Sequence, residues 1–261
     1  MMRLAGILAV LLIPVAAAAD EVALYAAGSL KAALGEVARD FEKTAGHRVK
    51  TTFAPSGLLR QRVEEGEPAD VFASANMEHP TKLNRNGLAG PVSMFARNKL
   101  CAIAQPGVVV NTTSLLDVLL NPKTRVGTST PKADPSGDYA WELFRKANKV
   151  RAGAFGILDS KAMKLTGGRG TTKAPKDRNL YGWIMESNKA DLFLTYCTNA
   201  VRAKKEVPSL KIVTVPEALS VDAEYGVTVL KGAPKAAEEL KSYILSADGR
   251  KVLAQYGFDA P

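Results

Sequence analysis

The sequence predicts an α/β protein whose mainly parallel sheets are flanked by helices. Segments typical of strands alternate with segments of helical periodicity along the whole chain, which is the pattern of parallel sheets. Two strand-to-helix units near the start share a small-residue turn that carries a serine. A long apolar-rich segment, residues 92–105, predicts a strand that can pass from one lobe to another. With 261 residues, the chain has room for one large domain or two small lobes.

Residues 1–19 have the composition of an export signal. Arg3 supplies a positive start, Leu4–Val15 is an apolar core, and Ala17–Ala19 offers small residues for cleavage before Asp20. The apolar run is too short to span a bilayer, and no cysteine follows the cleavage region for a lipid anchor. We therefore expect a soluble protein exported to the periplasm.

The segment Val22–Phe41 predicts a strand, a tight turn and a helix. Its first six residues are apolar, Gly28 permits a sharp bend, and Ser29 is a favoured helix N-cap. From Leu30 onward, apolar residues recur at helical spacing. In an open α/β sheet such a turn lies at the edge where ligands bind, and the helix N-terminus there favours an anion. The alternative is that Ser29 only caps its helix.

The next segments repeat this design. Residues 49–53 alternate as in a strand, Pro55 and Gly57 mark a turn, and Ser56 between them can cap the following helix. Residues 70–75 predict a third strand, which precedes the long strand predicted at residues 92–105.

The second half of the chain continues the alternation. Helices are predicted over residues 114–120, 139–147, 179–186, 234–245 and 249–255, and strands over residues 125–129, 161–165, 191–196, 210–215 and 225–230. The segments 131–137 and 166–175 predict loops, because they are rich in turn-forming residues.

The composition limits the class of partner. The formal net charge is +9, which favours acidic partners or anionic ligands. The alternative is a basic isoelectric point without specific meaning. The basic residues are scattered and form no motif that reads nucleic acid, so we expect no nucleic-acid partner.

The two cysteines, Cys101 and Cys197, are expected to form a disulfide. An oxidising compartment permits the bond, and both residues lie beside predicted strands that can meet where two lobes join. Two buried free thiols are the alternative. Two cysteines and two scattered histidines do not make a structural zinc site.

Several short motifs occur in an order that resembles the periplasmic molybdate-binding proteins of ABC importers. They are Ala27–Leu30 (AGSL), Phe53–Gly57 (FAPSG), Pro68–Ala75 (PADVFASA), Pro135–Ala140 (PSGDYA), Thr195–Tyr196, Gly249–Lys251 and Tyr256–Phe258. The likeness covers most of the chain after the export signal. It implies the two-lobed periplasmic-binding-protein fold, with one lobe at residues 20–104 and 225–261, the other at residues 105–224, and a ligand cleft between them.

The resemblance also implies a role and a set of partners. The protein is expected to be a monomeric binding protein and not an enzyme. It captures molybdate or tungstate, uses no cofactor, and delivers the ligand to a membrane ABC permease.

The resemblance implies five ligand-binding residues. Ser29 and Ser56 each donate a hydroxyl and a backbone N–H to the oxyanion, and Tyr196 donates its phenol. Ser136 donates a backbone N–H where the family usually has alanine. A further N–H falls at Arg178, where the family usually has a small apolar residue, so this side chain either points away or adds a charged donor. Molybdate is thus held mainly through Ser29, Ser56 and Tyr196.

The chemistry of a tetrahedral dianion agrees with this set. Such an ion only accepts hydrogen bonds, so its site needs many donors and no carboxylate facing it. A site of this kind rejects an ion that must keep a proton, because that proton would meet a donor. Molybdate and tungstate are too similar to separate, and sulfate, which is smaller, is expected to fit poorly. For each serine alone the alternative is helix capping, and for Tyr196 it is an ordinary half-buried aromatic residue.

The sequence offers weaker support for other functions. A hydrolase could combine Ser29 with His47 and Asp70, but the sequence has no G-x-S-x-G elbow. Residues 166–172 lack the ending of a phosphate-binding P-loop. The remaining alternatives are a binding protein for another oxyanion, a ligand sensor and a cell-surface adhesion module.

Overall fold

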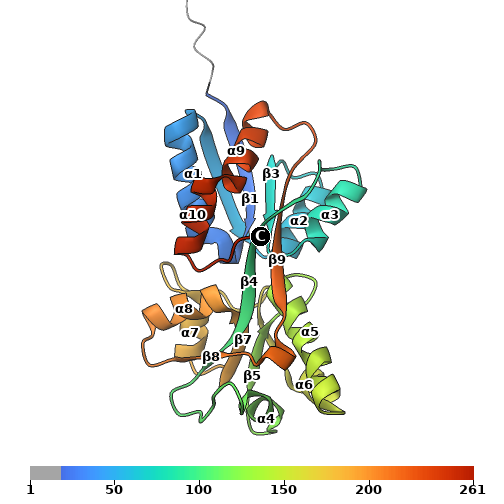
Figure 1. Cartoon of the computed structure of the whole chain (residues 1–261), viewed down its shortest axis with the longest axis vertical. Helices are drawn as coiled ribbons and strands as arrows, with labels where there is room; N and C mark the ends of the chain where they lie inside the picture. Colours follow the sequence, from blue (N-terminus) through green and yellow to red (C-terminus); the bar gives the residue numbers. More distant parts are fainter. Residues whose placement is uncertain (1–18) are drawn as a thin grey trace, which may run out of the picture.

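Two strands run between two lobes that are stacked along the long axis of the molecule (Figure 1). They are β4 (Ser93–Ala104) and β9 (Asp222–Val229). The computed structural model describes residues 19–261, so the predicted export signal lies almost wholly outside the described residues. Within residues 19–261, no helix combines the length and the apolar character that crossing a membrane requires.

Each lobe contains a small parallel sheet. In the first lobe β1 (Glu21–Ala27) pairs in parallel with β2 (Arg48–Ala54) and β3 (Val71–Ser74). In the second, β5 (Val126–Ser129) pairs in parallel with β6 (Met163–Thr166) and β7 (Leu192–Tyr196). The strands follow the order β2-β1-β3-β9-β4-β7-β5-β6, and β8 (Lys211–Thr214) pairs with β4.

The antiparallel pairs all involve a crossing strand. They are β3–β9, β4–β7, β4–β8 and β4–β9. The predicted parallel character therefore describes the body of each lobe, and the strands that connect the lobes add antiparallel pairs. Along β4, pairing with β9 ends at Lys99 and pairing with β7 begins at Leu100. The sheet thus passes from one lobe to the other inside β4.

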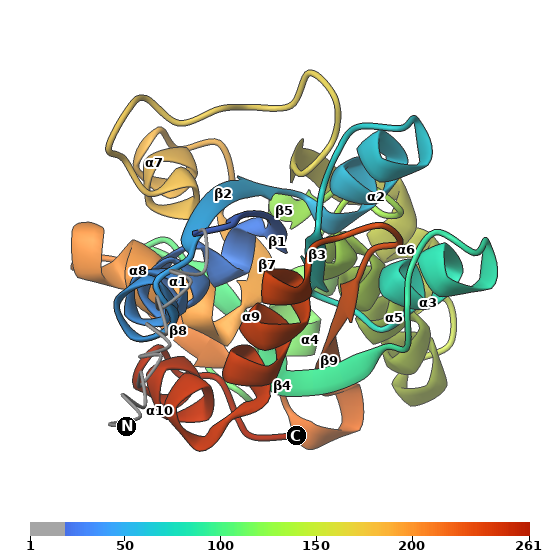
Figure 2. The same ribbon diagram turned by 90° about the horizontal axis from the view of Figure 1, so that it is seen from above.

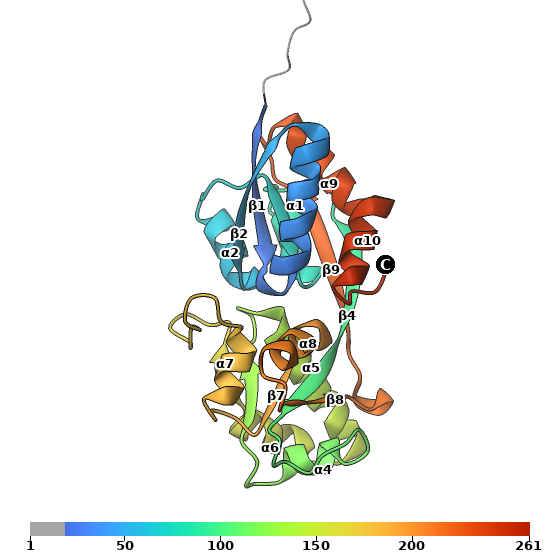
Figure 3. The ribbon, with the colours of Figure 1, turned by 90° about the vertical axis from the view of Figure 1, so that its left-hand side faces the viewer.

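The helices cover both sides of each lobe (Figures 1, 2 and 3). In the first lobe α1, α9 and α10 pack against one another, and α2 packs against α3. In the second, α7 packs against α8, and α5 packs against α6. Their bounds are α1 (Lys31–Ala45), α2 (Ser56–Glu64), α3 (Glu78–Arg85), α4 (Leu115–Leu120), α5 (Pro135–Val150), α6 (Ala154–Lys161), α7 (Leu180–Glu186), α8 (Cys197–Glu206), α9 (Lys235–Leu245) and α10 (Ala247–Gln255), with short 3-10 turns η1 (Gly28–Leu30) and η2 (Glu217–Leu219).

One apolar core connects the lobes. Leu34 of α1, Tyr225 of β9 and Phe144 of α5 are buried members of the same cluster. The predicted apolar face of α1 contributes to this core, because its apolar residues are all buried: Ala33, Leu34, Val37, Ala38 and Phe41. The crossing strands are therefore held by packing in both lobes.

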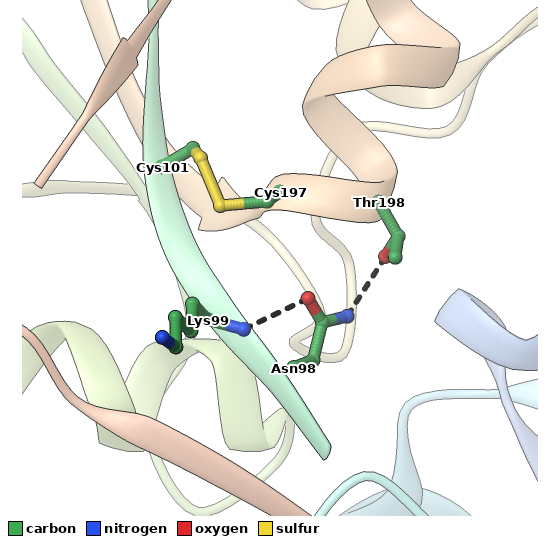
Figure 4. The surroundings of a disulfide bond; sticks show 5 residues. All are labelled: Asn98, Lys99, Cys101, Cys197 and Thr198. Carbon is green, nitrogen blue, oxygen red and sulfur yellow. Dashed lines mark hydrogen bonds between the residues drawn. A yellow bond between two sulfur atoms is a disulfide. The ribbon is translucent and has the colours of Figure 1, made fainter. Parts of the chain in front are cut away.

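A disulfide joins β4 to the first turn of α8 (Figure 4). The Cα atoms of Cys101 and Cys197 are 4.8 Å apart. Close by, the side-chain amide of Asn98 donates a hydrogen bond of 2.8 Å to the hydroxyl of Thr198, and its oxygen accepts the Lys99 N–H at 2.9 Å (Figure 4). The disulfide and the bond from Asn98 to Thr198 together fix α8 to the strand that links the lobes.

Candidate ligand-binding site

A cavity of about 310 Å³ lies between the lobes. Its lining includes Ser29, Ser56 and Ala75 from the first lobe and Asp134, Gly167 and Tyr196 from the second. Four of the five predicted ligand residues line it: Ser29, Ser56, Arg178 and Tyr196. The structure thus places hydroxyl groups from both lobes around one partly open cavity.

Ser29 lies in η1, immediately after β1. Its hydroxyl is 3.1 Å from the phenol oxygen of Tyr225, which belongs to the crossing strand β9. The alternative that Ser29 only caps its helix is wrong, because Ala27 is the N-cap of η1, Leu30 is that of α1, and neither turn has a side-chain cap. The Ser29 hydroxyl therefore connects the cavity to a crossing strand.

Ser56 and Tyr196 both form hydrogen bonds with Ala75, a residue of the first lobe. The fully buried Ser56 hydroxyl accepts the N–H of Ala75 at 3.1 Å. From the second lobe, the Tyr196 phenol donates to the carbonyl of Ala75 at 3.2 Å. Burial raises the pKa of Tyr196 well above its ordinary value, so the phenol keeps its proton and remains a donor. Tyr196 is therefore more than an ordinary half-buried aromatic residue, since it bridges the lobes.

The N-terminus of α2 touches the second lobe directly. The Gly57 N–H, in the first turn of α2, donates to the carbonyl of Ala133 at 2.9 Å. A Cβ atom on Gly57 would lie 2.1 Å from the carbonyl oxygen of Lys132 and 2.8 Å from that of Ala133. Only glycine permits this approach, so the lobes are in a closed arrangement that depends on Gly57.

Ser136 is placed differently from the prediction. It is absent from the cavity lining, and its N–H donates to the carboxylate of Asp134 at 3.0 Å. The hydroxyl of Ser136 is buried with no hydrogen-bond partner in the described part of the chain. The Ser136 N–H, which the family resemblance predicts as a donor to the oxyanion, thus donates to the side chain of Asp134 instead.

Asp134 itself lines the cavity, which the prediction of a site without a facing carboxylate does not anticipate. Asp134 is the N-cap of α5, and Pro135 is the first residue of that helix. Burial raises the pKa of Asp134 to about 6, although hydrogen bonds from the Ser136 N–H and the Ser129 hydroxyl lower it. The carboxyl group therefore takes up a proton closer to neutral pH than an exposed aspartate does.

Arg178 reaches the cavity with its charge already paired. Its guanidinium donates to Glu206 at 2.7 Å and to Glu186. Glu206 also accepts the N–H of Asn179 at 2.6 Å. The side chain is therefore committed to two glutamates, and it is not a free charged donor for a ligand.

Other cations surround the cavity. Lys31 and Arg202 line it, and no ion pair of either is found within residues 19–261. A more open groove of about 1170 Å³ shares these two residues and adds Lys176 and Lys205. The smaller cavity is the candidate ligand site, because the groove lacks the serines and Tyr196. The groove instead forms a positively charged surface beside the cavity, which attracts anions toward it.

Sequence reasoning overlooked three polar residues of this region. Tyr225 and Asn98 form a chain with Ser29, since the Asn98 amide lies 3.4 Å from the Tyr225 phenol oxygen. No local pattern marks these two residues, which meet only in the folded chain. Asp134 did carry a signal, because an aspartate before proline is typical of a helix start.

The family model described as bacterial extracellular solute-binding protein matches residues 22–259. The chain belongs to this family. The cavity between its two lobes is the candidate site for the solute. The described fold and the family together favour a binding protein over an enzyme.

Relatives of this solute-binding protein cover nearly its whole length. An uncharacterized protein of Pasteurella multocida is 36% identical over 212 residues, which is 81% of this chain and 87% of the relative. The molybdate-binding protein ModA of Escherichia coli is 29% identical over 258 residues, covering 93% of this chain and 91% of the relative. The solved periplasmic molybdate-binding protein of Azotobacter vinelandii has a TM-score of 0.71 at 22% identity, covers 92% of this chain and 99% of its own, and confirms the two-lobed fold.

Proposed function

We propose that this solute-binding protein captures molybdate or tungstate in the periplasm and delivers it to the membrane permease of an ABC importer. The observation that carries the proposal is the meeting of the Ser29 and Ser56 hydroxyls and the Tyr196 phenol around one cavity between the lobes. The Ser29 and Ser56 hydroxyls are uncharged donors, which suit an ion that only accepts hydrogen bonds. The Tyr196 phenol donates its proton to the Ala75 carbonyl and so holds the lobes together around the cavity. The similarity to the E. coli molybdate-binding protein supports the same ligand.

Ligand capture follows from the contacts between the lobes. The bonds from Gly57 to Ala133 and from Tyr196 to Ala75 join the lobes only when they are closed. An anion that bonds to both lobes favours this arrangement over an open one and shifts the population toward it. The closed form is then the one that the permease recognises.

A thermal-shift panel of oxyanions tests the proposal. Molybdate or tungstate at about 1,000 times its Kd should stabilise the folded protein by about 4 kcal/mol. For a chain of this size, that free energy corresponds to a rise in Tm of about 8–16 °C. Sulfate and chloride at the same ionic strength serve as controls and should give smaller shifts.

A panel in which no oxyanion raises the Tm above the chloride control would contradict the proposed function. A large shift with sulfate and none with molybdate would contradict the proposed ligand while keeping the oxyanion site.

A further inference from the structure

We propose that Asp134 makes anion binding proton-coupled: the occupied cavity holds one proton between the Asp134 carboxyl group and an oxygen of the bound oxyanion. This inference rests on the proposed function and adds a specificity-determining residue to its site. A fully deprotonated dianion such as molybdate then binds together with one proton from the solvent. An oxyanion that already carries a proton supplies it from its own hydroxyl group.

The position of Asp134 carries the inference. Asp134 lines the same cavity as Ser29, Ser56 and Tyr196. One carboxylate oxygen accepts the N–H of Ser136 at 3.0 Å, which holds the side chain at the N-terminus of α5. The carboxylate thus accepts the Ser136 N–H that the family resemblance predicts as a donor to the oxyanion.

The loop after β6 closes over this carboxylate. Gly167 lines the cavity too, and a Cβ atom there would lie 2.4 Å from the Cβ of Asp134 and 2.8 Å from its second carboxylate oxygen. Gly167 has a positive φ of 80°, which favours glycine. Asp134 therefore packs between the start of the helix and this loop, at the border of the cavity.

The groups facing Asp134 do not neutralise it. Asp138 of the same helix adds negative charge, and the Ser129 hydroxyl of β5 donates a hydrogen bond. Tyr181 of α7 and Tyr196 of β7 face it as neutral phenols; burial, with the charge of Asp134 as a smaller cause, raises the pKa of Tyr181 to about 12. Asp134 forms no ion pair within residues 19–261.

The cationic side chains that line the cavity do not pair with Asp134. Arg178 is bonded to Glu186 and Glu206, while Lys31 and Arg202 lie on the side that opens to the basic groove. An ionised Asp134 and a dianion would therefore meet as like charges in the cavity between the lobes. One proton between them replaces that repulsion with a hydrogen bond.

Proton coupling predicts a steep pH dependence for molybdate. Burial raises the pKa of Asp134 to about 6. The fraction of ligand-free protein in which Asp134 is protonated, the form that binds molybdate, therefore falls from about one half at pH 6 to about one hundredth at pH 8. The Kd of the wild-type protein for molybdate should therefore rise about 50-fold between pH 6 and pH 8. Calorimetry in buffers of different ionisation enthalpy should show the uptake of about one proton per molybdate at pH 8.

Asp134→Asn is the decisive variant. Asparagine keeps an oxygen for the Ser136 N–H and is itself a favoured N-cap, but it does not titrate. The variant should bind molybdate with a Kd that is flat between pH 6 and pH 8, without proton uptake, and at pH 8 more tightly than the wild-type protein. Asp138→Asn is the matched control, because Asp138 lies one turn further along α5 and outside the cavity lining. This variant should keep the proton uptake and the steep pH dependence of the Kd, displaced to a slightly lower pH, because the charge of Asp138 is a small cause of the raised pKa of Asp134.

The ligand-free protein gives an independent readout. Because the folded state binds the Asp134 proton more tightly than the unfolded chain, the stability of the wild-type protein should fall as the pH rises from about 4 to about 6. Asp134→Asn should remove this part of the pH dependence and confirm that the variant folds.

Two results would overturn the inference. Molybdate binding by the wild-type protein with a pH-independent Kd and no proton uptake would overturn it and leave the proposed function standing. The same would follow if Asp134→Asn bound molybdate with the wild-type slope and proton uptake. Failure of both proteins to bind any oxyanion at pH 6 would instead refute the proposed function, and the inference with it.

Discussion

Gly57→Ala is expected to weaken molybdate binding about 100-fold while leaving both lobes folded. In the closed arrangement the added methyl group would overlap the carbonyl oxygens of Lys132 and Ala133, at 2.1 and 2.8 Å. These atoms belong to the backbone, so they cannot turn aside as a flexible side chain would. Ligand affinity depends on the population of the closed form, and a loss of about 2.8 kcal/mol in closure corresponds to a 100-fold change.

The open form should tolerate this methyl group, because the overlap is with the opposite lobe. Gly57 lies within α2 and is not among the glycines of positive φ, so alanine suits its backbone. Gly156→Ala on α6 is the matched control, since its Cβ would meet no atom within 4 Å. Calorimetry measures the Kd of each variant, and circular dichroism verifies the fold. Wild-type affinity in Gly57→Ala would show that capture does not need this closed contact.

Ser29→Ala and Ser56→Ala are expected to weaken molybdate binding by roughly 10- to 100-fold each. A hydrogen bond to a charged group contributes about 1.5–3 kcal/mol. Ser56→Ala also leaves the Ala75 N–H without its acceptor, so it should lower the free energy of unfolding by about 1–3 kcal/mol. Ser29→Ala leaves the Tyr225 phenol near Asn98, so its effect on stability should be smaller.

A distant serine provides the control for these variants. Ser242 is exposed on α9, away from the cavity, and Ser242→Ala should keep the wild-type Kd. Isothermal calorimetry with molybdate at pH 6 compares the three variants. If Ser29→Ala and Ser56→Ala both keep the wild-type Kd, these hydroxyls are not ligands of the anion.

The opening of the chain was predictable because its signals are local. Six apolar residues, a glycine and a helical repeat of apolar positions gave β1 and α1 close to their observed bounds. The long strand β4 was also found, since twelve residues of mostly apolar character have few other interpretations. The paired use of β4 and β9 as antiparallel crossing strands depends on distant contacts, so no window of sequence shows it.

Two helices lacked a recognisable start. The helix α8 follows β7 without a turn, and its N-cap Tyr196 has no side-chain cap. The helix α6 begins after Gly153, whose φ is 83°, in place of a polar cap. The sequence predicts a loop over residues 131–137, whereas α5 begins at Pro135 with Asp134 as an ordinary N-cap.

The candidate site was predictable only in part, for a physical reason. Ser29, Ser56 and Tyr196 lie at the ends of strands that the fold brings to one place, so a family motif suffices to find them. The role of Asp134 depends on the loop that packs against it at Gly167, and the pairing of Arg178 depends on two other helices. Burial and charge at these two residues are tertiary properties, and the sequence alone does not determine them.

A crystal structure with bound molybdate, with diffraction data collected at the molybdenum absorption edge, tests the central claim most directly. The account predicts one strong anomalous peak inside the cavity of about 310 Å³, with the anion oxygens within hydrogen-bonding distance of Ser29 and Ser56. A peak in the open groove beside Lys176 and Lys205, with the smaller cavity empty at saturating molybdate, would contradict it.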